Sequence, residues 1–297
     1  MDVFSRTLQY IFTGIAVGSI YAMVALGFNI IYNCTGIINF AQGEFVMLGG
    51  MFMVTLTTVW KLPLILAFPL AVLLVVIIGI GFERIAIHPL KNPSVLILIM
   101  ITIAGSILIK GIAMFAWGKE ARFLPHFSGE KPIIIAGATI LPQSLWVIAS
   151  LVVVVAGLAF FFNRTLVGKA MRACSHNSDA ARLVGISVKQ MVTLSFALSA
   201  GIGAVAGVVI APITLMDYQR GAMLALKGFG AAILGGLGSG TGAVIAGLLI
   251  GVLESLGAGY ISSHYKDAIA LIVLLLVLFV RPSGLLGNID MQRLKKF

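Results

Sequence analysis

The sequence predicts an all-α integral membrane protein, a polytopic helical bundle with about 8–9 transmembrane segments. Hydrophobic residues make up 60% of the 297 residues, charged residues only 10%, and the mean hydropathy is +1.11. Soluble domains carry roughly a quarter charged residues. Apolar runs of the length that spans a bilayer recur along the whole chain, and basic residues gather in three of the connections between them. The chain is therefore treated as a single membrane domain, residues 1–297.

The predicted segments follow one another with short connections. Their ranges are 10–31, 36–60, 62–82, 95–117, 144–162, 191–213, 222–237, 241–256 and 264–280. The run 222–237 is short for a full crossing. Short, glycine-interrupted hydrophobic segments are typical of broken helices that line a transport pathway.

The connection 163–190 is the most polar stretch of the chain. Its bases are Arg164, Lys169, Arg172, Arg182 and Lys189, against the single acid Asp179. We expect a helix over 166–174 and a second over 177–186. Asn177 or Ser178 would cap the second helix, Gly185 would end it in a left-handed conformation, and Ile186 would pack back on it. Such a loop is either a rigid docking surface for a cytosolic partner or a lipid-binding loop.

Three basic regions, 84–91, 164–189 and 281–296, carry most of the positive charge of the connections. The positive-inside rule places all three on the cytosolic side and the N-terminus outside, provided that 222–237 and 241–256 both cross. A re-entrant 222–237 would break this parity. The tail 281–297, with Arg293, Lys295 and Lys296, is then cytoplasmic.

Polar residues interrupt two of the apolar segments. Asn39, Gln42 and Glu44 lie where the second segment should begin, and Glu254 lies inside the eighth. Polar groups at this depth should face protein or a water-filled cavity, which makes these four candidates for a translocation pathway. The alternatives are an interfacial helix start and a helix-internal partner. Lys110 is expected to snorkel toward the headgroups.

The run 235–242 is rich in glycine, but it has neither the P-loop nor the Gly-x-Gly-x-x-Gly pattern. We expect close helix packing and a tight turn from its glycines: Gly235, Gly236, Gly238, Gly240 and Gly242. No P-loop occurs anywhere in the chain, so any ATP would be bound by another polypeptide. No metal-ligand spacing and no nucleophile–base arrangement stands out, so we expect no cofactor, no metal and no enzyme activity.

Four separated motifs resemble the permeases of branched-chain amino-acid ABC importers, LivH type. They are residues 36–50 (GIINFAQGEFVMLGG), residues 168–186 (GKAMRA, then Asn177 and ARLVGI), residues 235–242 (GGLGS plus Gly242) and residues 281–287 (RPSGLLG). The resemblance implies a type II-like importer fold in a bacterial or archaeal inner membrane. It also implies a second, LivM-like permease, two ATP-binding subunits and a soluble substrate-binding protein, with no nucleic-acid partner.

The same resemblance assigns ATPase coupling to residues of the polar loop: Lys169, Arg172, Asn177, Asp179, Arg182, Gly185 and Ile186. The substrate expected from the family is a branched-chain amino acid, with urea, short amides or other amino acids as alternatives. A stand-alone secondary transporter would work without an ATPase and would carry more ionisable residues within its spans. A structural scaffold would leave the polar break at 39–44 unexplained.

Overall fold

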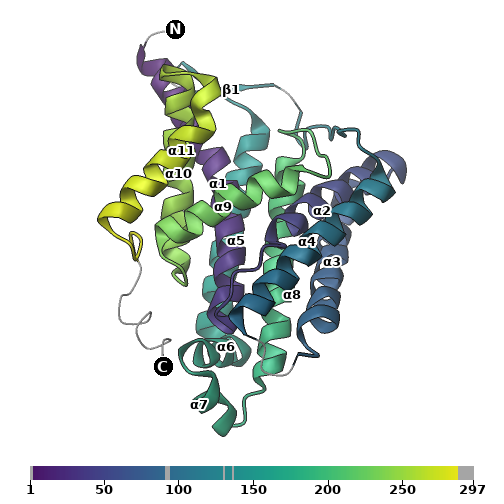
Figure 1. Cartoon of the computed structure of the whole chain (residues 1–297). Coiled ribbons are helices and arrows are strands. Elements are labelled where there is room, and N and C mark those ends of the chain that lie inside the picture. The colour runs from purple at the N-terminus through teal and green to yellow at the C-terminus, as the bar shows by residue number, and fades with distance from the viewer. Residues whose placement is uncertain (1–2, 91–93, 130, 136, 287–297) are drawn as a thin grey trace.

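The computed structural model describes residues 3–90, 94–129, 131–135 and 137–286, and helices dominate it (Figure 1). The helices are α1 (Val3–Thr35), α2 (Gln42–Val54), α3 (Leu64–Phe82), α4 (Val95–Trp117), α5 (Pro142–Arg164), α6 (Leu166–His176), α7 (Ser178–Leu183), α8 (Val188–Ile210), α9 (Arg220–Gly235), α10 (Gly240–Tyr260) and α11 (Lys266–Val280). Two π-helical turns, Thr55–Val59 and Glu83–Ile87, extend α2 and α3, and a 3-10 turn, Ser263–Tyr265, precedes α11.

Among the described residues, six helices are long and apolar enough to cross a membrane. They are Val3–Thr35, Leu64–Ile87, Val95–Trp117, Pro142–Arg164, Val188–Ile210 and Gly240–Tyr260. At about 1.5 Å per residue even the shortest of them spans roughly 30 Å, the thickness of the hydrocarbon core. The predicted class, a multi-span helical membrane protein, is confirmed at this level.

Helix α1 is the centre of the bundle. Every residue from Gly18 to Ile31 is buried, because α8, α9 and α10 surround that part of the helix. Gly14 and Gly18 allow the closest of these contacts: a Cβ on Gly18 would lie 2.8 Å from the carbonyl oxygen of Gly247 in α10. The Gly-x-x-x-Gly pair of the sequence therefore marks a real helix–helix contact.

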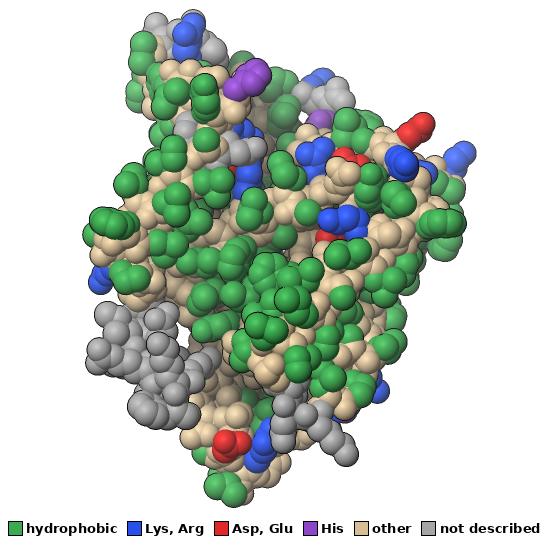
Figure 2. Space-filling model, in the orientation of Figure 1, with side chains coloured by type: hydrophobic (Ala, Val, Ile, Leu, Met, Phe, Trp, Pro, Cys, Tyr) green, Lys and Arg blue, Asp and Glu red, His purple; other side chains and the backbone are tan. Residues whose placement is uncertain are grey.

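The outer helices expose large apolar side chains. Ile77 of α3, Ile107 of α4, Val153 of α5 and Leu275 of α11 are all more than half exposed. Apolar side chains cover much of the face seen in Figure 2, and the Lys and Arg side chains there gather mainly near the two ends of the molecule. This distribution suits a surface that contacts lipid or other membrane-embedded protein.

Several boundaries differ from the sequence expectation. α1 starts at Val3, seven residues before the expected start at Tyr10. The connection 118–141 contains a small antiparallel hairpin, β1 (Ile133–Ile135) and β2 (Ala138–Ile140), in which Ile133 faces Ile140. The hairpin is held to α1 by Gln9, whose side-chain oxygen accepts hydrogen bonds from the N–H and hydroxyl of Thr139. Strands of three residues are too short to leave a hydrophobic pattern.

The expected pair of short segments is present as α9 and α10, which pack against each other and are joined by residues 236–239.

The connections α3–α4 and α5–α8 both lie at the end of the molecule opposite the start of α1 (Figure 1). We call this the α6–α7 end. Of the predicted basic positions, Lys91, Arg293, Lys295 and Lys296 lie outside the described residues.

Candidate functional site

The loop formed by α6 and α7 projects from the α6–α7 end (Figure 1). Thr165 breaks the path of α5 and caps α6, because its hydroxyl accepts the N–H of Gly168 at 2.9 Å. Gly168 packs directly on the backbone of Phe161, where any Cβ would clash. Arg172 donates hydrogen bonds to the carbonyl of Phe162 and, at 2.9 Å, to the side-chain oxygen of Asn163. The loop is thus fixed rigidly to the end of α5.

The local structure of α7 is the one predicted from its residues. The Asn177 side chain accepts the N–H groups of Asp179 and Ala180, each at 3.0 Å. Gly185 has φ +85°, and the N–H of Ile186 returns to the carbonyl of Ala181 at 3.0 Å. These caps make α7 a stiff unit in spite of its length.

The charges of α7 point into solvent. Asp179 and Arg182 form an ion pair at 3.4 Å, and both side chains are largely exposed. Pairs of this kind contribute about 1 kcal/mol or less to stability. Lys169 is exposed as well. These charged groups contribute little to folding and are accessible to a partner.

Two apolar side chains form the tip of the loop, and the sequence reasoning did not identify them. Leu183 is 89% and Val184 75% exposed, whereas Ala181, Met171 and Cys174 are buried against the rest of the loop. The sequence contains a signal for this exposure. On a helix as short as α7, residues 181 and 183 lie on different faces, so a helix that buries Ala181 leaves Leu183 exposed. Exposed apolar residues surrounded by polar ones mark an interaction surface.

A second feature is the non-helical segment between α1 and α2, residues 36–41. Gly36, with φ +73°, ends α1, and the side-chain oxygen of Asn39 accepts the N–H of Ala41 at 3.1 Å. The N–H of Phe40 is directed at the hydroxyl of Thr102 at 3.3 Å. Thr102 lies seven residues inside α4, so the segment sits about 10 Å in from the start of that helix.

The break therefore lies at membrane depth, partly exposed on one face of the bundle, and not in a loop at its end. Phe40 is 37% exposed, and its ring lies 5.9 Å from that of Phe229 in α9. Irregular backbone at membrane depth is tolerated only where it is buried in protein or lines a water-filled cavity. Asn39, Gln42 and Glu44, the polar neighbours of Phe40, are predicted from the sequence as pathway residues, but Phe40 itself is not.

Asn39 and Gln42 are completely buried. The amide of Gln42 donates to the carbonyl of Ser199 at 3.2 Å, and the Ser199 hydroxyl contacts both the Gln42 side-chain oxygen and the carbonyl of Gly27. These contacts join α1, α2 and α8. The side-chain nitrogen of Asn39 is buried and has no hydrogen-bond partner among the described residues.

Glu44 lies just beyond, 1% exposed, in the first turn of α2. One carboxylate oxygen accepts the hydroxyl of Ser106 at 2.9 Å and lies 3.8 Å from the Lys110 ammonium. The other oxygen is buried without a hydrogen-bond partner in the described structure. Lys110 was expected to snorkel; it lies beside an acid of the neighbouring helix.

Glu254 of α10 connects four helices, away from the α6–α7 end of the bundle. Its Oε1 atom receives Lys227 of α9 at 2.8 Å, Lys266 of α11 at 3.2 Å and the hydroxyl of Tyr21 of α1 at 3.2 Å. Lys227 also lies 5.4 Å from the centre of the Tyr21 ring. Glu254 is predicted from the sequence as a pathway candidate, but its two bases are not, although Lys227 stands inside an apolar segment where a base is as costly as an acid.

The glycine-rich turn between α9 and α10 is held by α1. Asn29 and Asn33 hydrogen-bond to the backbone of Gly238 and Ser239 at 2.9–3.1 Å. Gly236 and Gly238 have positive φ, and Gly235 touches the backbone of Gly242 so closely that neither tolerates a Cβ. The closing motif Arg-Pro-Ser-Gly-Leu-Leu packs on the same turn, with the N–H groups of Leu285 and Leu286 on the carbonyls of Leu234 and Gly235.

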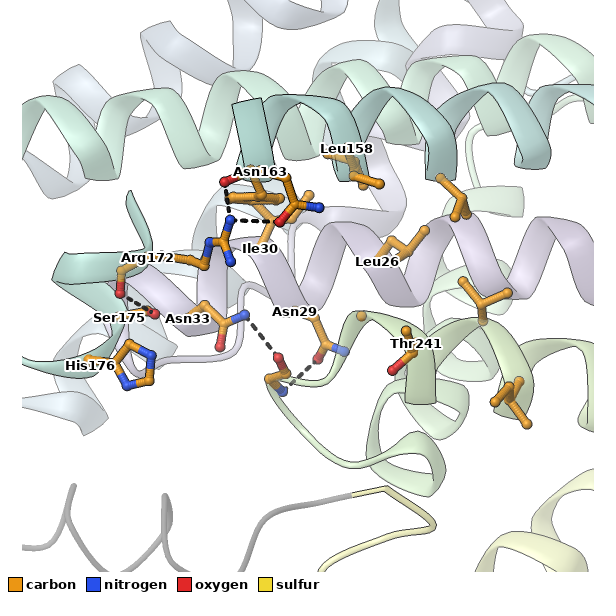
Figure 3. Close-up of a pocket in the computed structure, with 17 residues that line it drawn as sticks. Leu26, Asn29, Ile30, Asn33, Leu158, Asn163, Arg172, Ser175, His176 and Thr241 are labelled. Atoms are coloured by element: carbon orange, nitrogen blue, oxygen red, sulfur yellow. Dashed lines mark hydrogen bonds between the residues drawn. The ribbon is translucent and has the colours of Figure 1, made fainter. Parts of the chain in front are cut away.

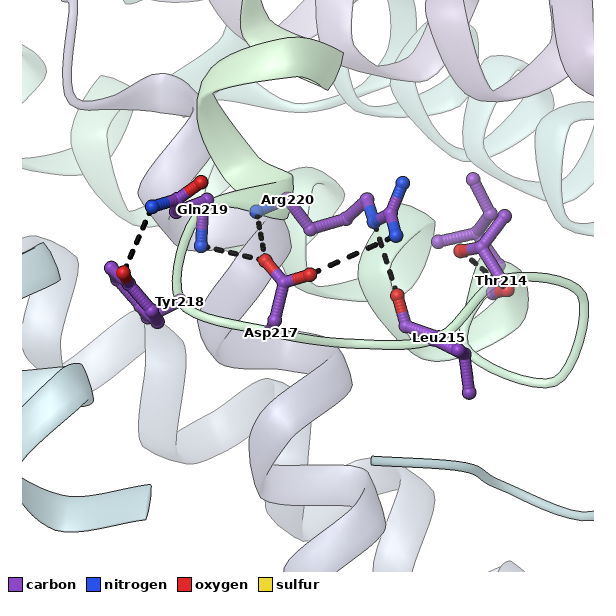
Figure 4. A network of polar contacts seen from close by, with 7 residues as sticks. Thr214, Leu215, Asp217, Tyr218, Gln219 and Arg220 are labelled. Carbon is purple, nitrogen blue, oxygen red and sulfur yellow. Dashed lines mark hydrogen bonds and ion pairs between the residues drawn. The ribbon is translucent and has the colours of Figure 1, made fainter. Parts of the chain in front are cut away.

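Two cavities lie against α1. The larger, about 630 Å³, runs between α1, α5, α6 and α10 (Figure 3). The smaller, about 270 Å³, lies between α1, α9 and α11 and is rimmed by Arg220, Lys227 and Lys266. Figure 4 shows how Arg220 is fixed there: Asp217 accepts its backbone N–H at 2.8 Å and lies 3.7 Å from its guanidinium, which also donates to the carbonyl of Leu215 at 3.0 Å.

The sequence-predicted residues thus fall into separate groups. The coupling residues lie together on α6 and α7, Asn39, Gln42 and Glu44 lie together at the break, and Glu254 lies apart from both. None of these four pathway candidates lines either of the two cavities described here.

Comparison with known proteins gives a match over nearly the whole chain. A family model described as branched-chain amino acid transport system / permease component matches residues 10–278. The high-affinity branched-chain amino acid transport system permease protein LivH of Salmonella typhimurium is 33% identical, over 98% of this chain and 99% of its own. The corresponding protein BraD of Pseudomonas aeruginosa is 32% identical, over 96% and 97%. The solved structure of PsaBC from Streptococcus pneumoniae with a Fab aligns over 94% of this chain at 15% identity and a TM-score of 0.46.

Proposed function

Because this chain belongs to the family of permease components of branched-chain amino acid transport systems, we propose that it is the permease subunit of an ATP-driven importer of branched-chain amino acids. The full-length match to LivH and BraD carries this proposal. The protein is then a multi-pass protein of a bacterial or archaeal plasma membrane. It forms the translocation pathway and leaves ATP hydrolysis to separate subunits.

The finer architecture is a type II-like importer fold with nine membrane segments. Besides the six long helices, α2 with its π-helical turn, α9 and α11 complete the count. An odd number of segments puts the two ends of the chain on opposite sides of the membrane, so a cytosolic C-terminal tail places the start of α1 outside and the α6–α7 end in the cytosol. The basic connections at that end support this orientation.

The loop of α6 and α7 docks onto one of two ATP-binding subunits. Leu183 and Val184 enter an apolar groove of the ATPase, while Lys169, Asp179 and Arg182 form the charged rim. The other coupling residues act by shaping the loop: Arg172 fixes α6 to α5, and Asn177, Gly185 and Ile186 form the two caps of α7. A helix that is capped at both ends transmits a movement of the ATP-binding subunit without bending.

The pathway runs along the face that contains the break 36–41. Irregular backbone at this depth cannot face lipid, so a second, LivM-like permease covers it and the two subunits enclose the route. Phe40 stands on that face, and behind it Asn39, Gln42 and Glu44 hold the break in place. Glu254 fixes the outer ends of α9, α10 and α11 on the side where a soluble binding protein delivers substrate.

The test is leucine uptake into proteoliposomes that contain this chain, its partner permease and both ATPases, with the binding protein outside. The variant reverses two charges of the loop, Arg172→Glu with Arg182→Glu. The control reverses two exposed bases at the opposite end, Lys119→Glu with Lys131→Glu. We expect uptake that requires ATP, that is lost in the loop variant together with ATPase co-purification, and that persists in the control.

Other results would replace parts of this proposal. Uptake without the ATPases would make the chain a secondary transporter. Suppose the assembly is intact and its ATPase responds to urea, a short amide or another amino acid, but not to leucine. The assignment as an ABC importer permease would then stand, and only the substrate would change. Normal uptake by Asn39→Ala and Glu44→Ala would remove these residues from the pathway.

A further inference from the structure

The larger cavity is an open groove at the α6–α7 end of the bundle. Its walls are α1, α5, the end of α6 and the start of α10, and its volume is about 630 Å³, within the 300–1,000 Å³ usual for ligand sites. The break 36–41 and its neighbours Thr102 and Phe229 do not line it. The groove is therefore a different surface from the pathway face proposed above.

Polarity changes along the groove. Figure 3 places Arg172, Ser175 and His176 at one end, on α6, and Leu26 and Leu158 farther along the helices. Val155, Val244 and Ile245 extend the apolar part. Asn29 and Asn33 also line the groove, but their amides are engaged by the turn of residues 238–239. The groups left to meet a ligand are a cationic end on α6, the side chain of Thr241 at the start of α10, and an apolar trough.

We propose that this groove binds an anionic phospholipid of the cytosolic leaflet. The headgroup phosphate lies against the guanidinium of Arg172 and the imidazole of His176, and one acyl chain lies in the trough between α5 and α10. α6 follows α5 directly, so these bases stand where that span leaves the membrane, at the level of the headgroups. Basic pockets between helices on the cytoplasmic side are typical sites for anionic headgroups.

Charge complementarity favours an anionic phospholipid over two other occupants, the chain's own C-terminal residues and an apolar helix of a partner. Arg172 uses one end of its guanidinium on Phe162 and Asn163, and a guanidinium has five N–H donors, so it can hold a phosphate as well. The chain's own terminal residues carry Arg293, Lys295 and Lys296, of the same sign as Arg172. A purely apolar helix of a partner would leave the cationic end of the groove without a counter-charge.

A lipid bound in this groove would also affect the loop that docks the ATPase. Arg172 belongs to the same helix as the loop proposed to dock the ATPase, so a bound lipid adds a third attachment of α6 to α5. The lipid would thereby stiffen the docking loop. Lipid binding in the groove does not depend on which substrate the protein carries, whereas the assignment to the cytosolic leaflet and the effect on the docking loop rest on the proposed function.

The test is lipid binding by the delipidated full chain in detergent, followed by native mass spectrometry during titration with phosphatidylglycerol or phosphatidylcholine. We expect phosphatidylglycerol to bind at least about tenfold more tightly, since a charge-assisted contact is worth that factor. Arg172→Gln should weaken phosphatidylglycerol about tenfold and phosphatidylcholine less, because the choline cation already offsets the charge of that lipid's phosphate. Ala159→Trp, which fills the trough, should weaken both lipids.

Two matched controls separate the groove from general effects. Arg182→Gln removes an exposed base of the same loop outside the groove, and Val153→Trp places the same side chain, tryptophan, at an exposed position of α5 outside it. Both should bind phosphatidylglycerol as the unchanged chain does. Equal binding of the two lipids, equal loss in Arg182→Gln and Arg172→Gln, or displacement of the lipid by inorganic phosphate alone would each overturn the proposal. So would loss of the bound lipid when the partner permease is added, because the groove would then be a subunit interface.

Discussion

Replacing Glu254 by glutamine should destabilise the protein mainly through the two lysines it leaves behind. The carboxylate is 1% exposed and receives Lys227 at 2.8 Å and Lys266 at 3.2 Å. Lys227 has only 16% of its side chain exposed, so its charge cannot return to water without moving α9, whereas Lys266 is 43% exposed and can turn outward. Most of the effect therefore comes from Lys227.

The size of the effect follows from known buried pairs. Removing one partner of a buried ion pair costs about 3–5 kcal/mol, because the remaining charge is uncompensated. Glutamine keeps one acceptor for the lysine, and Lys266 is partly solvated, so we expect about 2–3 kcal/mol for Glu254→Gln. In the double variant Lys227→Met with Glu254→Gln the buried ammonium of Lys227 is removed together with the carboxylate. That variant should lie within about 1 kcal/mol of the unchanged protein.

The assay is reversible unfolding of the purified chain in mixed micelles by added SDS, followed by circular dichroism for the unchanged protein, both single variants and the double variant. The double-mutant cycle isolates the interaction energy between positions 227 and 254. A loss below about 0.5 kcal/mol in Glu254→Gln would refute the reasoning. So would a double variant that is as unstable as the sum of the two single variants.

Three further predictions concern the glycine turn and the docking loop. Gly242→Ala should destabilise by about 1–3 kcal/mol or more in the same assay, because its Cβ would meet the carbonyl of Gly235, whereas Gly157→Ala, which meets nothing within 4 Å, should be neutral or stabilising. Leu183→Asp should abolish ATPase co-purification without changing the unfolding curve, since Leu183 is 89% exposed. Burial raises the pKa of the Cys174 thiol, so maleimide should label it far more slowly at pH 7.5 than a cysteine placed at position 183, with the rate rising as the pH increases.

Features that depend on local sequence could be predicted. The ends of α7 follow from an amide that caps at Asn177 and a glycine that adopts positive φ at Gly185, and both are properties of a few consecutive residues. The apolar runs predicted the long helices for the same reason, because each run must satisfy its own backbone in lipid. The break at 36–41 was visible as polar residues in an apolar run.

Features that depend on distant residues could not be predicted. Glu83 is 1% exposed and accepts the hydroxyl of Thr193 at 2.8 Å, although its sequence neighbours form a basic connection. Nothing near Glu83 in the sequence indicates that α8 passes beside it. The same holds for Lys266, which reaches Glu254 only because α11 turns back along α10. Such pairs are set by helix packing, which a single sequence does not contain.

The packing of α2 on α8 explains how the docking loop and the break can act together. Only four residues, 184–187, separate α7 from α8, so we expect a displaced α7 to move α8. Gly207 of α8 touches the backbone of Val46, and a Cβ on Gly49 of α2 would lie 2.5 Å from the carbonyl oxygen of Ala204, so no flexible side chain absorbs the motion. Close-packed interiors transmit strain. We therefore expect α2 to follow α8. α1 also packs on α8, but it is joined to α2 through Gly36, which has positive φ and open space around it. We therefore expect movement of α8 to reach residues 36–41, the segment between α1 and α2 that stands on the proposed pathway.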